Sequence, residues 1–445
     1  CSGVRVTKGK AEGTDQGGVA MQGNPMAIML ERGCVEWCSH PEELSSLFDS
    51  EMVTGYIGFD PTADSLHVGH LIPMMGLAWM QRCGHRPIAI AGMGTGLIGD
   101  PSGKSKERNL LTLEQVEKNL VTVKEQLGQF LDFDCGPNSA LIVNNHDWLG
   151  KQTLLGFLRD TGKYFTVNYM IGREYVKSRL DDPEKSISYT EFSYMLLQAF
   201  DFCHLFENFS CKLQMGGNDQ QGNIIAGIDL IRKKVGGQAY GITYPLLLNA
   251  SGGKFGKTEG GTVWLSAERT SPYRFYQFWI NSDDRDVEKL LKLFTFLPLE
   301  EIEDIMDSHR ARPERRDAQK RLAREVTARL HGEEPFKMAE RASTILFGDS
   351  FEPSELTPGM IKILMSEVPG GVFPGDAAPS PVDVLAASGA CASKSEARRL
   401  IQGGGVYLNG RRLNPADEVD RQDLIEGKHL FFRLGKKRFF VASKG

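Results

Sequence analysis

The sequence predicts a doubly wound α/β domain with a parallel sheet, followed by an α-helical domain and a small α+β domain. Three observations support this order. Short apolar runs alternate with helical stretches at first, helices without strands follow Ser271, and a small basic module follows a segment rich in Pro, Gly and Ala. We expect residues 1–24 to be a disordered extension, 25–265 the α/β domain, 266–367 the helical domain, 368–380 a linker and 381–445 the small domain.

The composition is that of an ordinary globular chain. Of its 445 residues, 41% are hydrophobic and 24% are charged, which excludes disordered, collagen-like and coiled-coil proteins. The formal net charge of -5 leaves a nucleic-acid enzyme open, because acidic surface elsewhere can outweigh a basic segment in the sum. The eight cysteines are scattered without a CxxC pair, as is typical of reduced thiols inside cells. No apolar run approaches the roughly 20 residues that span a bilayer, so we expect a soluble protein.

The α/β domain is predicted from short apolar runs that resemble buried parallel strands. These are Gly55 to Phe59, Pro87 to Ala91, Ala140 to Val143, Lys212 to Met215 and Tyr244 to Leu248. Helical stretches separate the runs. Ligands of such sheets bind at the carboxyl ends of the strands, where the strand order reverses, so the chemistry is expected on the loops that follow the strands.

The helical domain is predicted to begin at Ser271 and Pro272, which suit an N-cap and a first helical turn. Its segment from Arg310 to Arg329 has more arginine than acid. Such a run is usually a solvated helix face, but an excess of arginine also suits phosphate binding, and both interpretations stay open.

The small C-terminal domain concentrates positive charge. A short helix, a Gly-rich turn and a strand are predicted there, and they carry Lys394, Arg398, Arg399, Arg411 and Arg412. These cations are candidates for RNA contacts.

The segment Tyr56 to Leu71, "YIGFDPTADSLHVGHL", places two histidines where a strand gives way to a helix. A helix start offers unpaired backbone N–H groups, so His67 and His70 are placed to hold a nucleotide phosphate, and Gly69 lets a base or ribose approach the backbone. A lone His-x-x-His is more often a capped helix start with two satisfied imidazoles. No further zinc ligands are evident nearby.

Two Gly-rich loops supply further cations. "GMGTGLIGDPSGKSKER" ends with Asp100 and the cations Lys104, Lys106 and Arg108, and it lacks the spacing of a P-loop. "GGKFGKTEGG" carries Lys254, Lys257 and Thr258, which suit a departing pyrophosphate. Taken alone, the first loop is a flexible surface turn about as often as a binding site, and the second is more often a loop with solvated lysines.

A predicted helix, "SYTEFSYMLLQAFDF", carries a polar stripe on an apolar background. Tyr194, Gln198 and Asp201 recur at i, i+4 and i+7 and therefore face one side. Either buried partners or a ligand must satisfy them, and we favour a ligand.

Taken together and in this order, the motifs resemble those of class I aminoacyl-tRNA synthetases, with "HVGH" in place of the HIGH sequence and "KFGKT" in place of the mobile KMSKS loop. In detail the chain resembles the bacterial and organellar tyrosyl branch, from about Tyr56 to the C-terminus. The resemblance implies a Rossmann-like catalytic domain and an S4-like RNA-binding domain at the C-terminus.

The resemblance also assigns substrate contacts. It implies that Tyr56 and Asp201 bind the phenol of tyrosine, that Tyr194, Gln198 and Asp100 meet its ammonium group, and that Asn145 and Gln214 lie on the tyrosine side. It implies ATP-binding positions at Gly58, Asp60, Gly69, Gly217, Asp219, Gln220 and Lys257. Thr62 and His67 are assigned to the γ-phosphate, His70 to the nucleotide, and Lys104, Arg108, Lys254, Lys257 and Thr258 to the pyrophosphate. No protein metal site is expected, and Mg²⁺ should accompany ATP.

The implied partners are L-tyrosine, ATP, tRNA(Tyr) and a second copy of the chain. The implied compartment is the cytoplasm for a bacterial protein, or the mitochondrial or plastid matrix for an organellar one. Gln221 departs from the tryptophan usual in this family, and Pro73 lies at a position that varies. A tryptophanyl enzyme is the nearest alternative, and the phenol-binding pair argues against it. An RNA-binding or intron-splicing protein without catalysis is the alternative from another class, although the catalytic motifs are intact.

Overall fold

The computed structural model describes residues 23–61, 63–102, 112–182, 186–250, 252–253, 255–258, 261–348, 351–374, 380–435 and 438–445. The chain forms two compact units. The first runs to Ser266 and also includes Asp283–Ser308, and the second comprises Ala267–Ser282 and His309–Gly445. No described helix is both long enough and apolar enough to cross a membrane.

The first unit is built on a six-stranded sheet in the order β1-β6-β5-β2-β3-β4. Its strands are β1 (Trp37–Cys38), β2 (Thr54–Phe59), β3 (Arg86–Ala91), β4 (Leu141–Asn144), β5 (Cys211–Gly217) and β6 (Tyr240–Tyr244). All neighbours are parallel except β1, which pairs antiparallel with β6. The strand order reverses beside β2, because β3 and β4 lie on one side of it and β5 and β6 on the other. The predicted doubly wound fold is confirmed.

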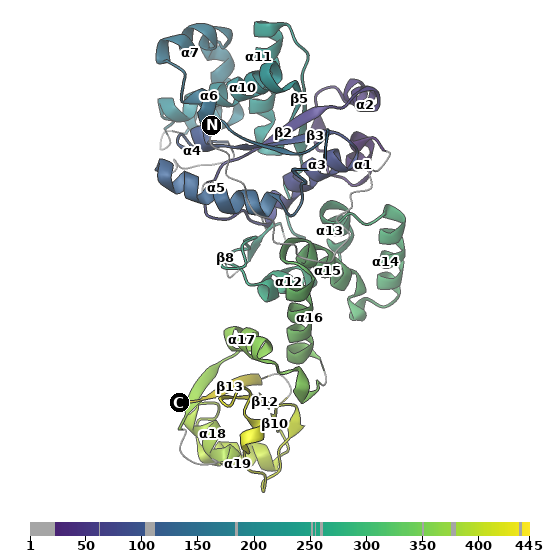
Figure 1. The fold of residues 1–445 in the computed structure, drawn as a ribbon, viewed down its shortest axis with the longest axis vertical. Helices are drawn as coiled ribbons and strands as arrows, with labels where there is room; N and C mark the ends of the chain where they lie inside the picture. The colour runs from purple at the N-terminus through teal and green to yellow at the C-terminus, as the bar shows by residue number, and fades with distance from the viewer. Residues whose placement is uncertain are drawn as a thin grey trace. The chain divides into compact units, whose positions relative to one another are not determined.

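Helices cover both faces of this sheet, with α10 (Tyr189–Phe209) and α11 (Gln221–Val235) above it and α3 (Leu71–Arg82) and α5 (Leu113–Leu127) below it in Figure 1. Successive residues of β2 face opposite sides of the sheet, and this alternation explains the division. Tyr56 packs against Phe202 of α10, whereas a Cβ at Gly55 would lie 2.8 Å from Met80 of α3, so glycine permits close packing there. The remaining helices of this unit are α1 (Pro25–Glu31), α2 (Pro41–Ser50), α4 (Met93–Gly96), α6 (His146–Leu149), α7 (Leu154–Asp160), α8 (Val167–Ile171), α9 (Glu174–Leu180) and α13 (Val287–Phe294).

The second unit begins with helices, as predicted, and ends in a small sheet. The helices are α12 (Pro272–Ile280), α15 (Asp317–His331), α16 (Glu333–Phe347) and α17 (Pro358–Glu367), while α14 (Leu299–Ala311) runs from the first unit into the second. The sheet has the order β11-β10-β12-β13-β9. It contains β9 (Gly370–Phe373), β10 (Val406–Leu408), β11 (Arg411–Arg412), β12 (His429–Leu434) and β13 (Arg438–Lys444), and α18 (Pro381–Ala387) and α19 (Lys394–Gln402) accompany it.

Two local predictions were wrong. The last strand of the large sheet is Tyr240–Tyr244, not Tyr244 to Leu248, because Pro245 has no N–H to donate to a ladder and the preceding β-branched and aromatic residues form the strand instead. The predicted linker contains β9, which pairs parallel with β13. A Cβ at Gly371 would lie 1.8 Å from the carbonyl oxygen of Ser388, so glycine lets this strand lie close to its neighbours.

Candidate functional site

The predicted phenol-binding pair lies at the point where the strand order reverses. Tyr56 is in β2 and Asp201 is in α10, and both are almost fully buried. The Tyr56 hydroxyl has no hydrogen-bond partner among the described residues. A buried hydroxyl without a partner is costly, so this atom is suited to a polar group of a ligand.

The Asp201 carboxylate is held by two donors. Asn145 donates its Nδ2–H to one oxygen at 2.9 Å, and Trp148 donates its Nε1–H to the other at 2.6 Å. Burial raises the pKa of Asp201 to about 7, with Asp60 adding to the rise, while the bonds from Asn145 and Trp148 lower it. These donors thus favour the ionised form, which accepts hydrogen bonds. Burial also raises the pKa of Tyr56 well above its usual value, so its hydroxyl stays protonated and can donate.

A second carboxylate lies beside this pair. Asp60 accepts a hydrogen bond from the Thr95 hydroxyl at 3.0 Å and a long one from the Tyr194 hydroxyl at 3.4 Å. Asn145 donates to the Thr95 hydroxyl at 2.9 Å, which connects Asp60 to the donors of Asp201. Burial raises the pKa of Tyr194 well above its usual value, with Asp60 and Asp100 adding to the rise.

A third carboxylate, Asp100, belongs to a network on the β5 side of the site. The Gln220 side chain donates to Asp100 at 2.6 Å, and the backbone N–H of Ser102 donates at 2.9 Å. Asn223 links Gln198 and Ser102 by donating to their side chains at 2.9 and 3.2 Å. The network therefore brings Asp100, Gln198 and Gln220 together, three residues that were predicted from separate segments.

Other predicted residues follow the carboxyl ends of β2 and β5. Gly217 ends β5, and Asp219 and Gln220 follow it. Gly58 is exposed near the end of β2, and a Cβ there would meet nothing within 4 Å. Gln214 is buried in β5, and its Oε1 has no partner among the described residues. Most of these predicted residues thus lie at the carboxyl ends of two adjacent strands, β2 and β5.

The two histidines cap their own turn. His67 accepts the Gly69 N–H at Nδ1 (3.1 Å), and His70 accepts the His67 N–H at Nδ1 (3.1 Å). The interpretation of the two histidines as caps of a helix start is therefore correct for their Nδ1 atoms. Burial, with the His67 side chain adding, lowers the pKa of His70 to about 3, so this imidazole is neutral. With Nδ1 accepting, a neutral ring carries its proton on Nε2, which leaves that atom as a donor.

The glycine-rich segment from Gly252 to Gly261, here named the lysine loop, lies next to this histidine turn. Lys257–Thr258 form β7, which pairs with β8 (Gly261–Thr262) in a hairpin whose backbone the structure describes. The strand after the hairpin bonds to the histidine segment, from Val68 N to Val263 O at 3.0 Å and from Leu265 N to Leu66 O at 2.8 Å. Thr62, Lys104, Lys106, Arg108 and Lys254 lie outside the described residues. Two of the three predicted phosphate-binding segments, the histidine turn and the lysine loop, are therefore adjacent.

Sequence reasoning missed several residues of this site. Thr95, Ser102, Trp148 and Asn223 complete the networks around the three carboxylates. Asn145 was predicted on the tyrosine side, and in the fold it is fully buried and bonds to Asp201 and Thr95. The one available signal was that Trp148 follows Asn145 at i+3, on the same side of a short helix.

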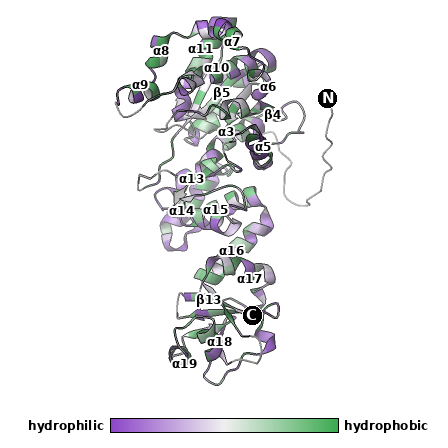
Figure 2. Ribbon diagram, turned by 90° about the vertical axis from the view of Figure 1, so that its left-hand side faces the viewer, coloured by the Kyte–Doolittle hydropathy of each residue, from purple (hydrophilic) through white to green (hydrophobic). Residues whose placement is uncertain are grey.

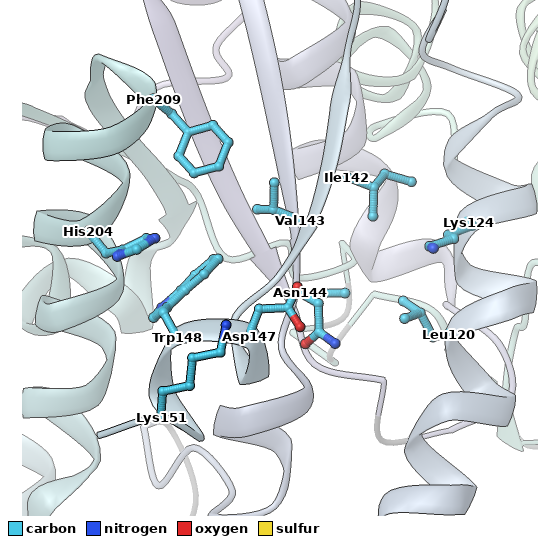
Figure 3. A pocket seen from close by; sticks show the side chains of 11 residues that line it. Leu120, Lys124, Ile142, Val143, Asn144, Asp147, Trp148, Lys151, His204 and Phe209 are labelled. Carbon is cyan, nitrogen blue, oxygen red and sulfur yellow. The ribbon is translucent and has the colours of Figure 1, made fainter. Parts of the chain in front are cut away.

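A cavity of about 480 Å³ adjoins the site on the other side of Trp148. Figure 3 shows it beside β4, between Lys124 on one side and His204 and Phe209 on the other. The His204 ring stacks on Trp148 with 4.4 Å between centroids. None of the described lining residues was predicted as a site residue, and the contact that bears on the site is the support that His204 gives to the Trp148 ring.

The predicted RNA-binding cations differ in their surroundings. Lys394 pairs with Asp383 at 2.7 Å, Arg411 pairs with Asp417 at 3.1 Å, and Arg412 donates to the carbonyl of Gly404. Arg398 and Arg399 are exposed on α19, and neither forms an ion pair with a described residue. These two arginines are the most available to a phosphate backbone.

The chain is similar in sequence to known proteins of one family. Residues 49–348 match the family model of class I tRNA synthetases (W and Y), and residues 382–425 match the S4 domain. The chain is 54% identical to a tyrosine–tRNA ligase of Roseiflexus castenholzii, over 89% of this chain and 94% of that one. It is 50% identical to a tyrosine–tRNA ligase of Geobacillus stearothermophilus, over 94% of this chain and 98% of that one.

A solved structure is similar as well. A truncated mitochondrial tyrosyl-tRNA synthetase of Coccidioides posadasii matches with a TM-score of 0.63 and 32% identity, over 72% of this chain and 91% of that one. The family model alone covers both tryptophanyl and tyrosyl enzymes, and the named relatives distinguish between them. The chain therefore belongs to the class I tRNA synthetases, and within them to the tyrosine–tRNA ligases of bacterial type.

Proposed function

We propose that the protein activates L-tyrosine with ATP and transfers it to the 3′ end of tRNA(Tyr). The observation that supports this best is a buried pair: Tyr56 is a donor without a partner among the described residues, and Asp201 is an acceptor held by two donors. A phenol can accept from the first and donate to the second. Phenylalanine has no hydroxyl and would leave both groups unpaired, which buried polar groups tolerate poorly.

The first step is an in-line displacement at phosphorus. The tyrosine carboxylate attacks the α-phosphorus of ATP, the new C–O–P bond gives tyrosyl-adenylate, and the bond to pyrophosphate breaks. No side-chain nucleophile is required, so the protein contributes position and charge. Asp100, Tyr194 and Gln198 orient the ammonium group of tyrosine, and Gly58, Asp60, Gly217, Asp219 and Gln220 border the nucleotide.

Charge stabilisation is assigned to the histidine turn and the lysine loop. His67 and His70 offer Nε2–H donors to the phosphates, a role that follows from their occupied Nδ1 atoms. Lys254, Lys257 and Thr258, together with Thr62, Lys104 and Arg108, meet the departing pyrophosphate. Mg²⁺ accompanies ATP and is bound through the phosphates. Among the described residues, no group of three or more His, Cys, Asp or Glu is arranged to hold a metal ion.

Transfer to tRNA is the second step, and an aminoacylation assay tests it. The protein should attach tyrosine to bacterial tRNA(Tyr) and not to the eukaryotic cytosolic tRNA. Charging of neither tRNA, from a preparation that binds tyrosine and ATP, would contradict the proposed transfer step. The protein acts either in the cytoplasm or in an organelle matrix. The same assay in an organellar extract tests the second alternative.

The S4 domain is proposed to bind tRNA through Arg398 and Arg399. Replacing both with Ala should weaken tRNA binding and reduce the slope of log K against log salt by about 1.5, since each phosphate contact contributes about 0.7–0.9. Arg411→Ala is the control, because Arg411 already pairs with Asp417 and should change the slope by less than the roughly 0.7–0.9 of one phosphate contact. A double variant that binds tRNA with the wild-type salt slope would rule out this surface.

A second copy of the chain is proposed to cover apolar surface on α7, α8 and α9. The described large apolar side chains that are exposed there are Leu154, Leu155, Leu158, Val167, Ile171 and Leu180, together with Tyr189 at the start of α10, and Leu155 is 79% exposed. Hydrophobic residues colour α7 and α8 green in Figure 2. Exposed apolar side chains gathered in one segment are typical of an interface between copies.

The dimer predicts a change in mass. Leu155→Glu should convert a dimer into a monomer in sedimentation equilibrium, because a charge would be buried without a partner. Leu30→Glu, at another exposed leucine, is the control and should leave the mass unchanged. A wild-type protein that sediments as a monomer at micromolar concentration would contradict the proposed interface.

A further inference from the structure

The lysine loop is a glycine-rich hairpin that needs an external support. Gly252, Gly256 and Gly261 have φ angles of 83°, 82° and 104°, which residues other than glycine rarely adopt. Its base is a turn closed by Asn249, whose side chain accepts the Gly253 N–H at 2.7 Å. Such a segment loses much conformational entropy when it is ordered, so its position depends on contacts outside the hairpin.

Helix α13 provides two such contacts, at both of its ends. Asp286, immediately before the helix, accepts a hydrogen bond from the backbone N–H of Ala250 at 2.8 Å. Phe294, the last residue of the helix, stacks on Phe255 of the loop with 5.6 Å between centroids and an interplanar angle of 13°. One contact lies before the lysine pair, and the other lies between Lys254 and Lys257.

The same helix is fixed to the catalytic core through α3. The buried guanidinium of Arg32 lies 4.4 Å over Trp79 of α3 and donates to the carbonyls of Lys292 and Thr295 at 3.1 Å, at the end of α13. Phe296, two residues beyond the helix, packs on Trp79 at 5.0 Å. Helix α3 begins directly after His70, so α13 is anchored to the helix that carries the histidine turn.

The loop is thus held between two supports of one rigid assembly. On one side residues 263–265, after the hairpin, bond to residues 66–68, and a Cβ at Gly256 would lie 2.4 Å from the Val68 side chain. On the other side it rests on Asp286 and Phe294. We propose that Asp286, Phe294 and Phe255 are positioning residues that hold the lysine loop against the histidine turn for adenylate formation. The inference rests on the proposed role of this loop in the first step.

A positioning role and a merely structural role differ in what they change. If the contacts aim the loop, their loss slows the chemical step and leaves tyrosine binding intact, because the phenol pair lies on β2 and α10 and not on the loop. If they only stabilise the fold, their loss lowers the melting temperature, and the rate and tyrosine affinity fall together.

The test compares matched pairs of variants at two sites. Phe255→Leu removes the stack and keeps apolar bulk, while Phe255→Tyr keeps a ring. Asp286→Ala removes the acceptor of the Ala250 N–H, while Asp286→Asn keeps an acceptor oxygen. We expect the single-turnover rate of tyrosyl-adenylate formation to fall about tenfold in Phe255→Leu and Asp286→Ala. This loss is smaller than the roughly 10²-fold loss that a 1 Å misplacement can cause. The Tyr and Asn variants should recover most of the rate, and the Kd for tyrosine should stay within twofold of wild type in all four.

A second readout does not depend on activity. Trypsin cleaves after lysine, so a loop released from α13 should be cut after Lys254 and Lys257 several-fold faster in Asp286→Ala than in Asp286→Asn, since neither substitution changes the cleaved sequence. Wild-type adenylate rates in Phe255→Leu and Asp286→Ala, with unchanged cleavage in Asp286→Ala, would overturn the inference, and so would a proportional loss of tyrosine binding. Absence of adenylate formation in the wild type would instead contradict the proposed function, and the cleavage rates would still decide whether α13 holds the loop.

Discussion

Replacing Asp201 with Ala should lower the preference for tyrosine over phenylalanine by roughly 10- to 150-fold. The carboxylate is the acceptor for the substrate phenol, and hydrogen bonds to charged groups contribute about 1.5–3 kcal/mol. We therefore expect kcat/KM for tyrosine in pyrophosphate exchange to fall by roughly 10- to 150-fold, while the low value for phenylalanine changes little. The N–H donors of Asn145 and Trp148 lose their acceptor in the same variant, which adds some loss of stability.

Glu191→Ala is the matched control for this change. Glu191 is another buried carboxylate of α10. It forms an ion pair with Arg179 at 2.6 Å and does not belong to the phenol-binding pair. Its loss should destabilise the fold, since it removes one member of a buried ion pair, but it should not alter the ratio of kcat/KM for tyrosine to that for phenylalanine. An unchanged ratio in Asp201→Ala would show that the carboxylate does not read the phenol.

Replacing Lys257 with Ala should slow tyrosyl-adenylate formation by roughly 10²-fold, as the loss of one transition-state donor does in other enzymes. Tyrosine binding should remain near the wild-type value, because the positive charge is needed only as charge develops on the leaving pyrophosphate. Stopped-flow measurement of the first step and equilibrium dialysis with tyrosine separate the two quantities.

Lys289→Ala serves as the comparison, because Lys289 is an exposed lysine on α13. It should leave both quantities unchanged. Equal losses of adenylate rate and tyrosine affinity in Lys257→Ala would argue against a role confined to the transition state.

Much of this architecture could be predicted because its signals are local. Buried parallel strands appear as short apolar runs, and the polar stripe of Tyr194, Gln198 and Asp201 follows directly from helical spacing. The stripe was correctly placed on one helix, and each of its members has a protein partner: Asp60, Asn223, and the pair Asn145 and Trp148. Buried partners, one of the two explanations considered, are therefore present whether or not a ligand also binds.

The parts that could not be predicted depend on contacts between distant segments. Trp148 bonds to Asp201 across 53 positions, and no periodicity marks that pairing. The stack of Phe255 on Phe294 joins a glycine-rich loop to a helix that the sequence placed in another domain. Hydrophobicity alone predicts a strand from Tyr244 to Leu248, because it does not register the missing N–H of Pro245.

Pyrophosphate–ATP exchange by the wild-type protein, measured separately with tyrosine, phenylalanine and tryptophan, tests most directly whether Tyr56 and Asp201 form a socket for a phenol beside the nucleotide. We expect strong exchange with tyrosine and little with the other two amino acids. Exchange with tryptophan that equals or exceeds exchange with tyrosine would contradict the account.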